Sequence, residues 1–282
     1  MPKSNLSDFN PGYSEHYESK RDTQEEFQEQ ILRLRELQGK LYARASYGML
    51  IILQALDAGG KDGVIKHVMS GVNPQGCKVK SFKKPSSEEL AHDYLWRCMT
   101  SLPKRGYIGI FNRSYYEEVL TARIHPQILA SQNLPFHHEN LHLDKKFWHT
   151  RYEDIVNFEK YFTNNGFTVV KFFLNLSRDE QKRRFLSRIE KPGKNWKFTM
   201  SDIEDRKHWD SYQTAYDEMM KHTSHKEAPW YVIPADKKWY MRLVISKIIV
   251  QKLEKLNLTY PLPGPEHLKD IAKAKEILEG ER

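Results

Sequence analysis

One short segment combines glycines, a lysine and two acids in a spacing suited to phosphate binding. It runs from Ala55 to Lys66 as ALDAGGKDGVIK, follows the most apolar run of the chain and precedes a helical pattern. Glycines let backbone N–H groups approach phosphate oxygens at a helix N-terminus, and Lys61 can reach terminal phosphates. The segment departs from G-x-x-x-x-G-K-[ST], because Ala55 replaces the first glycine and Asp62 the hydroxyl residue. The competing interpretation is a solvated turn.

Two carboxylates, Asp57 and Asp62, lie inside this otherwise anion-binding segment. Acids so close to a phosphate repel it unless a cation lies between them. Mg²⁺ binds through one or two carboxylates together with phosphate oxygens, which resolves the conflict. We therefore expect Asp57 and Asp62 to hold Mg²⁺, with Mn²⁺ as a substitute.

A second polar group follows another apolar run, in IGIFNRSYYEE (residues 108–118). Strands of a parallel sheet present such residues at their carboxyl ends, where α/β folds bind ligands. Asn112, Arg113 and Glu117 are therefore expected near the glycine-containing segment, and Arg113 can clamp a phosphate bidentately. The alternative is a helix cap at Asn112 with a routine Arg113–Glu117 pair.

The third feature is a basic stretch between Arg178 and Lys207, which carries ten basic and six acidic residues. Arg184 and Arg188 are four apart and share one helix face. The polar segment 190–200, EKPGKNWKFTM, has the composition of a turn between two helices. We expect a helical lid at about 178–210 that closes over phosphates, with a merely solvated charged face as the alternative.

Five apolar segments alternate with helical patterns along the chain, at 49–56, 77–82, 107–111, 168–176 and 230–235. Such alternation predicts an α/β fold in three layers, with helices on both faces of a parallel five-stranded sheet. An amphipathic helix is expected from Thr23, and capping boxes predict helices that begin after Ser86, Ser177 and Ser201. We divide the chain into an extended arm (1–22), one domain (23–260) and a charged helical tail (261–282).

Composition narrows the class of protein. The 282 residues carry a net charge of +8, which favours a polyanionic partner without identifying it. Cys77 and Cys98 are the only cysteines, so a disulfide scaffold is excluded and a reducing compartment is indicated. The N-terminal residues lack the apolar core of a secretory signal, and no run is long enough for a membrane span. We expect a cytoplasmic protein without a membrane partner.

In this order, the segments resemble those of a family-2 polyphosphate kinase. The resemblance covers roughly residues 25–260 and rests on LDAGGKDGVIKHVMSGVNPQG, GYIGIFNRSYYEEVL, KFFLNLSRDEQKRRF and NWKFTMSDIEDRKHWDSY. It implies a P-loop kinase-like α/β/α fold with a lid, Mg²⁺ dependence and a homodimer or homotetramer. It also implies direct phosphoryl transfer between inorganic polyphosphate and nucleotides, namely AMP, ADP, ATP and also guanine nucleotides. Asn112-Arg113-Ser114 resembles the subgroup that accepts both mono- and diphosphates.

The resemblance also implies roles for individual residues. Catalysis would fall to Asp57, Lys61, Arg113 and Arg178. Phosphates would bind at Ala58, Gly59, Gly60, Lys61, Asp62, Gly63 and Lys66. A basic channel for polyphosphate would be formed by Lys66, Lys83, Arg123, Arg183 and Arg184. The acceptor nucleotide would meet Asn112, Arg113, Tyr116 and Glu117.

Two other functions compete with this interpretation. A nucleoside monophosphate kinase with ATP as donor would share the fold, the loop and the lid. A nucleic-acid-binding protein would explain the basic charge and the aromatic residues Trp196 and Trp209, but none of the known nucleic-acid motifs is present. His138 and His142 have helical spacing for a metal, but we favour a surface histidine cluster, because no H-E-x-x-H or nearby cysteine accompanies them.

Overall fold

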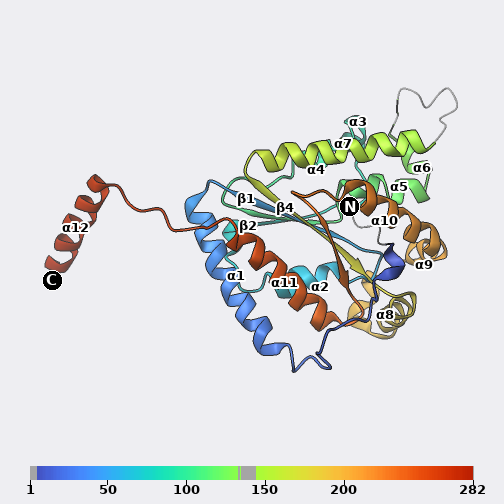
Figure 1. Cartoon of the computed structure of the whole chain (residues 1–282), viewed down its shortest axis with the longest axis horizontal. Helices are drawn as coiled ribbons and strands as arrows, with labels where there is room; N and C mark the ends of the chain where they lie inside the picture. Colours follow the sequence, from blue (N-terminus) through green and yellow to red (C-terminus); the bar gives the residue numbers. More distant parts are fainter. Residues whose placement is uncertain (1–4, 133, 135–143, 282) are drawn as a thin grey trace.

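The computed structural model describes residues 5–132, 134 and 144–281, which form a five-stranded sheet between two layers of helices (Figure 1). The strand order is β2-β3-β1-β4-β5, and all four strand pairs are parallel. The strands are β1 (Gly48–Gln54), β2 (Cys77–Ser81), β3 (Ile108–Asn112), β4 (Phe167–Asn175) and β5 (Trp230–Pro234). Each coincides with one of the five apolar segments, so the predicted three-layer α/β fold is confirmed.

Strand β1 lies at the centre of the sheet and is buried at all seven positions. Its register pairs Leu53 with Asn112 of β3 on one side and with Phe172 of β4 on the other. The residues that follow β1 and β3 therefore leave the sheet side by side. This register brings two distant sequence segments to one edge.

One face of the sheet is covered by three helices, α1 (Gln24–Arg44), α2 (Lys61–Val68) and α11 (Lys238–Glu254). Leu34 and Leu41 of α1 and Ile245 of α11 are fully buried against alternate residues of β1, β3 and β4. Thr23 precedes α1, so this helix begins where the sequence predicts it. The packing leaves the N-terminus of α2 at the carboxyl edge of the sheet.

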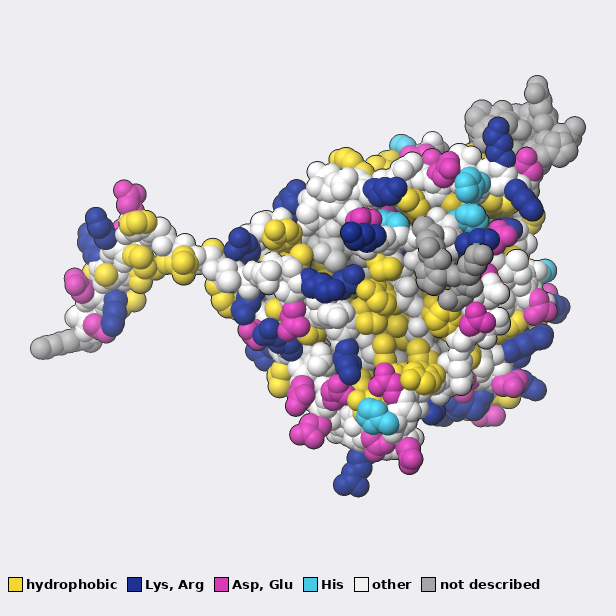
Figure 2. Space-filling model, viewed as in Figure 1, with side chains coloured by type: hydrophobic (Ala, Val, Ile, Leu, Met, Phe, Trp, Pro, Cys, Tyr) yellow, Lys and Arg dark blue, Asp and Glu magenta, His cyan; other side chains and the backbone are white. Residues whose placement is uncertain are grey.

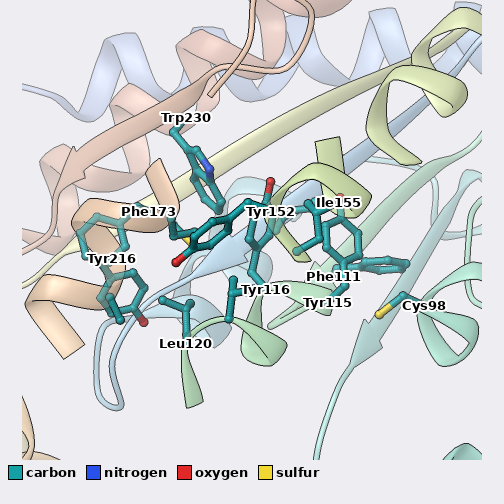
Figure 3. Packing of buried hydrophobic residues seen from close by; sticks show 14 of the residues in the cluster. Cys98, Phe111, Tyr115, Tyr116, Leu120, Tyr152, Ile155, Phe173, Tyr216 and Trp230 are labelled. Atoms are coloured by element: carbon teal, nitrogen blue, oxygen red, sulfur yellow. The ribbon is translucent and has the colours of Figure 1, made fainter. Parts of the chain in front are cut away.

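The opposite face carries α7 (Lys145–Asn164) and α10 (Trp209–Thr223), with short helices beside them. Its core is rich in aromatic rings, among them Tyr115, Tyr116, Phe173 and Tyr216 (Figure 3). The short elements on this face are α3 (Ser87–Ala91), α4 (Trp96–Met99), η3 (Tyr115–Glu118), α5 (Thr121–Ile124) and α6 (Gln127–Ala130), whereas η2 (Pro74–Gly76) lies beside α1. Ser86 caps α3 with the reciprocal Glu89 bond that the capping box predicts.

The basic segment, which we define as residues 178–207, contains α8 (Arg178–Glu190), η4 (Pro192–Lys197) and α9 (Met200–Lys207). Figure 2 shows Lys and Arg side chains gathered over this part of the molecule. Ser177 caps α8 as predicted, but α9 begins earlier than predicted. Its capping box joins Thr199 to Asp202 instead of Ser201 to Glu204, because Asp202 also satisfies the exposed N–H groups of the first turn.

Both ends of the chain lie outside the sheet layers. The N-terminal stretch contains η1 (Leu6–Asp8) and crosses the ends of β4 and β5, where Asn175 Nδ2 donates to Phe9 O (2.9 Å) and Asp236 N to Pro11 O (3.1 Å). The tail helix α12 (Pro265–Gly280) stands clear of the body and is exposed along its length (Figure 1). Among the described residues, no helix has the length and apolarity needed to cross a membrane.

Candidate active site

The glycine loop, which we define as residues 55–63, turns sharply between β1 and α2. Ala58 and Gly60 both adopt positive φ angles, 63° and 110°. A side chain at Gly59 would place its Cβ 2.5 Å from the Cβ of Ala55, so only glycine fits there without a shift. The loop thus ends at the N-terminus of α2, where unpaired backbone N–H groups favour an anion.

Lys61, the first residue of α2, lies beneath the loop with 8% of its surface exposed. Its Nζ donates to the carbonyl oxygens of Ala55 (2.7 Å) and Leu56 (3.4 Å). Burial and then the nearby Arg113 lower the pKa of Lys61 to about 8, although neighbouring carboxylates oppose the shift. A phosphate on the loop would stabilise the charged form, so this ammonium lacks the anion that would fully balance it.

Asp57 and Arg113 join the loop to the end of β3. Arg113 Nη2 donates to Asp57 Oδ1 at 2.6 Å, and Arg113 N donates to Leu53 O at 3.1 Å. Burial alone would raise the pKa of Asp57, but Arg113 and Lys61 outweigh it and leave that pKa below its ordinary value. Asp57 is therefore an ionised carboxylate, and Arg113 is held at the loop with a φ angle of 65°.

Glu117 completes the charge arrangement round Arg113. Its Oε2 lies 3.8 Å from Arg113 Nη1, so the i,i+4 pair weighed in the sequence analysis is present in addition to the bond to Asp57. Gln54 Nε2 donates to Glu117 Oε1 (2.9 Å) and Thr121 Oγ1 to Oε2 (2.6 Å). Glu117 and then Asp57 raise the pKa of Arg113, which stays a cation at any working pH.

Asp62 lies on the outer side of the loop, with its side chain 66% exposed. One oxygen accepts from Asn112 Nδ2 and the other from Lys197 Nζ of η4, both at 2.9 Å. Burial alone would raise the pKa of Asp62, but the hydrogen bonds from Lys197 and Asn112 outweigh it and leave that pKa below its ordinary value. The structure thus brings Asn112, predicted at the strand end, into contact with the second loop acid.

The donor set of the loop fits Mg²⁺. Asp57 and Asp62 supply ionised carboxylate oxygens, the hard ligands that Mg²⁺ prefers, and one or two such groups suffice when phosphate oxygens and water complete the shell. No group of three or more His, Cys, Asp or Glu side chains gathers for a metal in the described residues, so a cage made wholly of protein is not offered there. In this structure Asp57 pairs with Arg113 and Asp62 pairs with Lys197.

Arg184 and Gln181 of α8 hold the glycine loop in place. Gln181 Nε2 donates to Asp57 O at 3.0 Å. The Arg184 guanidinium donates to Glu180, to Ala58 O and Gly59 O of the loop, and to the carbonyls of residues 235 and 236. Its five N–H groups are thereby all used, so in this arrangement Arg184 positions the loop instead of lining a polyphosphate channel.

The other predicted channel residues lie in varied surroundings. Lys66 and Lys83 are exposed, and within the described chain their ammonium groups have no ion-pair partner. Arg183 is 70% exposed and pairs with Glu180, whereas Arg178 is exposed at the start of α8. Arg123 bonds to Glu218 and Tyr152 and lies over Trp148, and these contacts tie α5 to α7 and α10.

Tyr116 belongs to the core. Its ring has no exposed surface and lies among the aromatic side chains of Figure 3, and its hydroxyl donates to Glu159 Oε1 at 2.7 Å. We therefore assign Tyr116 to the support behind Arg113 rather than to the acceptor site. The predicted histidine cluster at residues 136–142, with His138 and His142, lies outside the described residues.

Sequence reasoning missed four side chains that the structure places at or near the site. Gln181 and Lys197 contact the loop. The Nη2 of Arg242 would lie 3.5 Å from a Cβ at Gly63, and its Nε is buried without a hydrogen-bond partner among the described residues. Lys238 is surrounded by cations: desolvation and then Arg184 lower its pKa to about 8. The sequence carries no signal for these four residues beyond their basic or amide side chains, because the residues that they contact are remote in sequence.

A parallel α/β sheet with a glycine loop, ionised carboxylates and clustered cations at its carboxyl edge defines a protein that binds phosphate groups. Residues 17–260 match the family described as polyphosphate kinase 2. The chain therefore belongs to the polyphosphate kinase 2 family.

Individual relatives agree with this assignment. An ADP-polyphosphate phosphotransferase of Rhodopseudomonas palustris is 50% identical over 262 residues, which cover 93% of this chain and 90% of the relative. An AMP/ADP-polyphosphate phosphotransferase of Meiothermus ruber is 46% identical, with 82% of this chain and 81% of the relative covered. The crystal structure of polyphosphate kinase 2 from Arthrobacter aurescens TC1 superposes with a TM-score of 0.88 at 36% identity, and covers 98% of this chain and 94% of its own.

Proposed function

We propose that this polyphosphate kinase moves the terminal phosphoryl group between inorganic polyphosphate and adenine nucleotides, AMP to ADP and ADP to ATP, with Mg²⁺. The observation that carries the proposal is the convergence of Lys61, Arg113 and two ionised loop carboxylates at one edge of the sheet. Relatives named as ADP-, AMP/ADP- and GDP-polyphosphate phosphotransferases support this substrate class. Guanine nucleotides are therefore secondary acceptors in the proposal.

Phosphoryl transfer between two polyanions is mainly a matter of position and charge. Its transition state is loose and in line, and it places charge on the equatorial oxygens of the transferred group. Lys61 from the loop and Arg113 from the end of β3 would neutralise that charge from two directions, with Arg178 of α8 as a third cation. The acceptor phosphate is already a competent nucleophile, so no general base and no covalent enzyme intermediate are required.

Asp57 and Asp62 would hold the metal in the proposed mechanism. A Mg²⁺ or Mn²⁺ ion held there would supply positive charge that offsets the charge of the phosphates. Asp57 would keep its orientation through Arg113 and through Gln181, which fixes its backbone. Glu117, held by Gln54 and Thr121, would keep Arg113 aimed at the loop.

The donor chain needs cations beyond the loop, and two groups of them flank it. Arg242, Lys66 and Lys20 all act with burial to lower the pKa of His67 on α2. On the other side, desolvation and then Arg184, Lys194 and Arg183 lower the pKa of Lys238, and Glu180 opposes the shift. Cations that repel one another in this way are stabilised by a bound polyanion, so we assign the polyphosphate path to these two groups without Arg184, whose N–H groups are all used by the protein. This path replaces Arg123 and retains Lys66 and Arg183.

A donor exchange tests the proposal. The purified protein is given Mg²⁺ and either AMP or ADP, with long-chain polyphosphate or ATP as donor, and nucleotides are resolved by chromatography. ADP and ATP formed with polyphosphate as donor support the proposal. Conversion of AMP with ATP but not with polyphosphate would instead identify a nucleoside monophosphate kinase. No turnover with either donor, combined with salt-sensitive binding of nucleic acid, would leave a polyanion-binding protein.

We further propose that the chain works as a homodimer or homotetramer in the cytoplasm. Cys77 and Cys98 are both free thiols, which suits a reducing compartment. Light-scattering mass at several protein concentrations tests the assembly, and a monomer mass throughout would contradict it.

A further inference from the structure

The tip of the basic segment reaches the glycine loop through one ion pair. Lys197, the last residue of η4, places its Nζ 2.9 Å from Asp62 Oδ2, while the other oxygen of Asp62 accepts from Asn112. The remaining bonds between this segment and the loop come from α8, through Gln181 and Arg184. Within the described residues, Lys197–Asp62 is thus the single hydrogen-bonded contact between the loop and any part of the segment beyond α8.

This pair differs from the α8 contacts in how easily it can separate. The Lys197 and Asp62 side chains are 37% and 66% exposed, whereas that of Arg184 is 5% exposed. Exposed ion pairs contribute at most about 1 kcal/mol, since water competes for both partners. A lysine ammonium on its four-carbon stem can also turn to another anion, which the multiply bonded guanidinium of Arg184 cannot.

The pair also occupies a group that the proposed mechanism needs. Asp62 is one of the two carboxylates assigned to the metal, and a lysine ammonium and a divalent ion at the same oxygen would repel each other. The ammonium must therefore leave when the metal and its phosphates arrive. Phosphate oxygens then lie next to the vacated position, and they form stronger charge-assisted hydrogen bonds than an exposed carboxylate does.

We propose that Lys197 is a substrate-binding residue that exchanges partners: it pairs with Asp62 in the free protein and with a phosphate oxygen when metal and substrate are bound. In the first state it balances the charge of the loop acids. In the second it draws η4 over the phosphates and excludes water from them. This inference rests on the proposed function, because it takes Asp62 as a metal ligand.

The exchange predicts two effects of opposite sign for Lys197→Met. Loss of the ammonium removes a competitor at Asp62, so a divalent ion should bind the substrate-free protein more tightly. The same loss removes a phosphate contact, so transfer from polyphosphate should become slower. A lysine that merely tethers η4 would predict no gain in metal affinity, because its loss would only loosen the loop.

The first experiment measures Mn²⁺ binding to the full-length, substrate-free protein by the electron paramagnetic resonance signal of free Mn²⁺. Lys197→Met should bind Mn²⁺ about 2- to 5-fold more tightly than the wild type, because an exposed ion pair of this strength no longer competes. Lys191→Met, a change at a neighbouring exposed lysine, should leave the affinity unchanged. In an Asp62→Asn background, Lys197→Met should bring no gain. Unchanged or weaker Mn²⁺ binding by Lys197→Met would overturn the proposal.

The second experiment measures kcat/KM for polyphosphate. Lys197→Met should lower it about 10- to 100-fold, the range for a lost charge-assisted hydrogen bond, and Lys197→Arg should restore part of it. Equal rates for wild type and Lys197→Met would overturn the phosphate contact. The two experiments distinguish failure of the inference from failure of the proposed function. Absence of transfer from polyphosphate by the wild type would refute the proposed function. The Mn²⁺-binding result alone decides whether Lys197 competes with a metal at Asp62.

Discussion

Two groups of charged side chains in this molecule differ in nearly every physical respect. At the sheet edge, Asp57–Arg113 and Asp62–Lys197 are pairs with partly exposed members. Between β4 and α7, Lys171 of the strand and Glu159 of the helix form an ion pair of 2.6 Å with no exposed surface on either side chain. Under the proposed function the first group takes up the substrate, whereas the second is closed to solvent.

The buried group is fully satisfied by its surroundings. Glu159 accepts from Tyr115, Tyr116 and Lys171, and His225 Nε2 lies 3.0 Å from its second oxygen. Lys171 also donates to Tyr116 Oη and to the carbonyl of residue 223. A charge buried in this way is tolerated only when its partners are complete. Because Tyr115 and Tyr116 follow Arg113 and Ser114 directly, the network fixes the turn from which Arg113 reaches the loop.

The difference shows that charged side chains with different tasks occupy different surroundings in this fold. In the proposed function the charges that bind phosphate must be able to change partners, and the pairs at the edge are accordingly incomplete or partly exposed. Charges that hold the edge in place must not change partners, so they are buried and saturated. Substitutions in the two groups should therefore affect different measured quantities.

Lys61→Met should have the largest effect, and it should fall on activity. We expect transfer from polyphosphate to ADP to fall about 10³- to 10⁵-fold, the range for a cation that stabilises the transferred phosphoryl group. The free energy of unfolding should be unchanged or raised, because Lys61 is buried at a cost. Coupled assays of ATP and urea unfolding measure the two quantities. A lower free energy of unfolding with transfer activity retained would contradict the assignment of Lys61 to transfer instead of to stability.

Lys171→Met should act in the opposite way. Removal of one partner leaves the Glu159 carboxylate buried and unpaired, which costs about 3–5 kcal/mol of unfolding free energy. Urea unfolding measures the loss. Lys207→Met provides the matched control, since the Lys207–Glu204 pair is well exposed and its loss should cost under about 1 kcal/mol. A cost for Lys171→Met as small as that of the control would refute the structural role of the buried pair.

The pH dependence of stability should single out Lys61. Its pKa is about 8 in the folded protein and 10.5 ordinarily, so between these values the unfolded chain binds more protons. Stability therefore rises with pH through this window, and the cost of the buried charge is fully present below about pH 8. From pH 7.5 to 9.5 the wild type should gain about 2 kcal/mol relative to Lys61→Met. Parallel urea curves at both pH values measure the gain, and identical pH profiles would contradict it.

The smallest effect is expected from Arg183→Ala. This side chain is 70% exposed and its ion pair with Glu180 should contribute under about 1 kcal/mol to stability. As one cation of the proposed path, it should raise the KM for polyphosphate only a few-fold. Arg184→Ala, one residue further, removes five hydrogen bonds to the protein and should lower the thermal midpoint clearly. Similar losses of stability for the two neighbours would erase the distinction between exposed and buried charge.

Much of the site at the carboxyl edge of the sheet could be predicted, because parallel strands all end at the same edge. Asp57 follows β1 and Arg113 follows β3, so an apolar run before each was enough to place them together. The five strands and the helix from Thr23 followed from hydrophobic patterns of the same kind. Glycines with an adjacent lysine likewise marked the loop, although the pattern could not tell that Lys61 would lie beneath it.

The buried group escaped prediction for a physical reason. A lysine inside β4 and a glutamate inside α7 are ordinary residues in sequence, and only the packing of α7 on the sheet makes them partners. The same packing turns Tyr116 into the core, and the placement of α8 directs Arg184 at the loop. Lys197 and Asp62 are 135 residues apart, so nothing local announces their contact. Charge pairs that form only in the tertiary structure leave no periodic pattern in the sequence.

Hydrogen exchange of the wild type with and without Mg²⁺ and polyphosphate tests the central claim most directly. If the edge charges change partners while the buried ones stay fixed, protection should rise in the glycine loop and in residues 192–207. It should remain the same in the segments around Tyr116, Glu159 and Lys171. Unchanged exchange in the glycine loop, or altered exchange round the buried pair, would contradict the division between exchangeable and fixed charges.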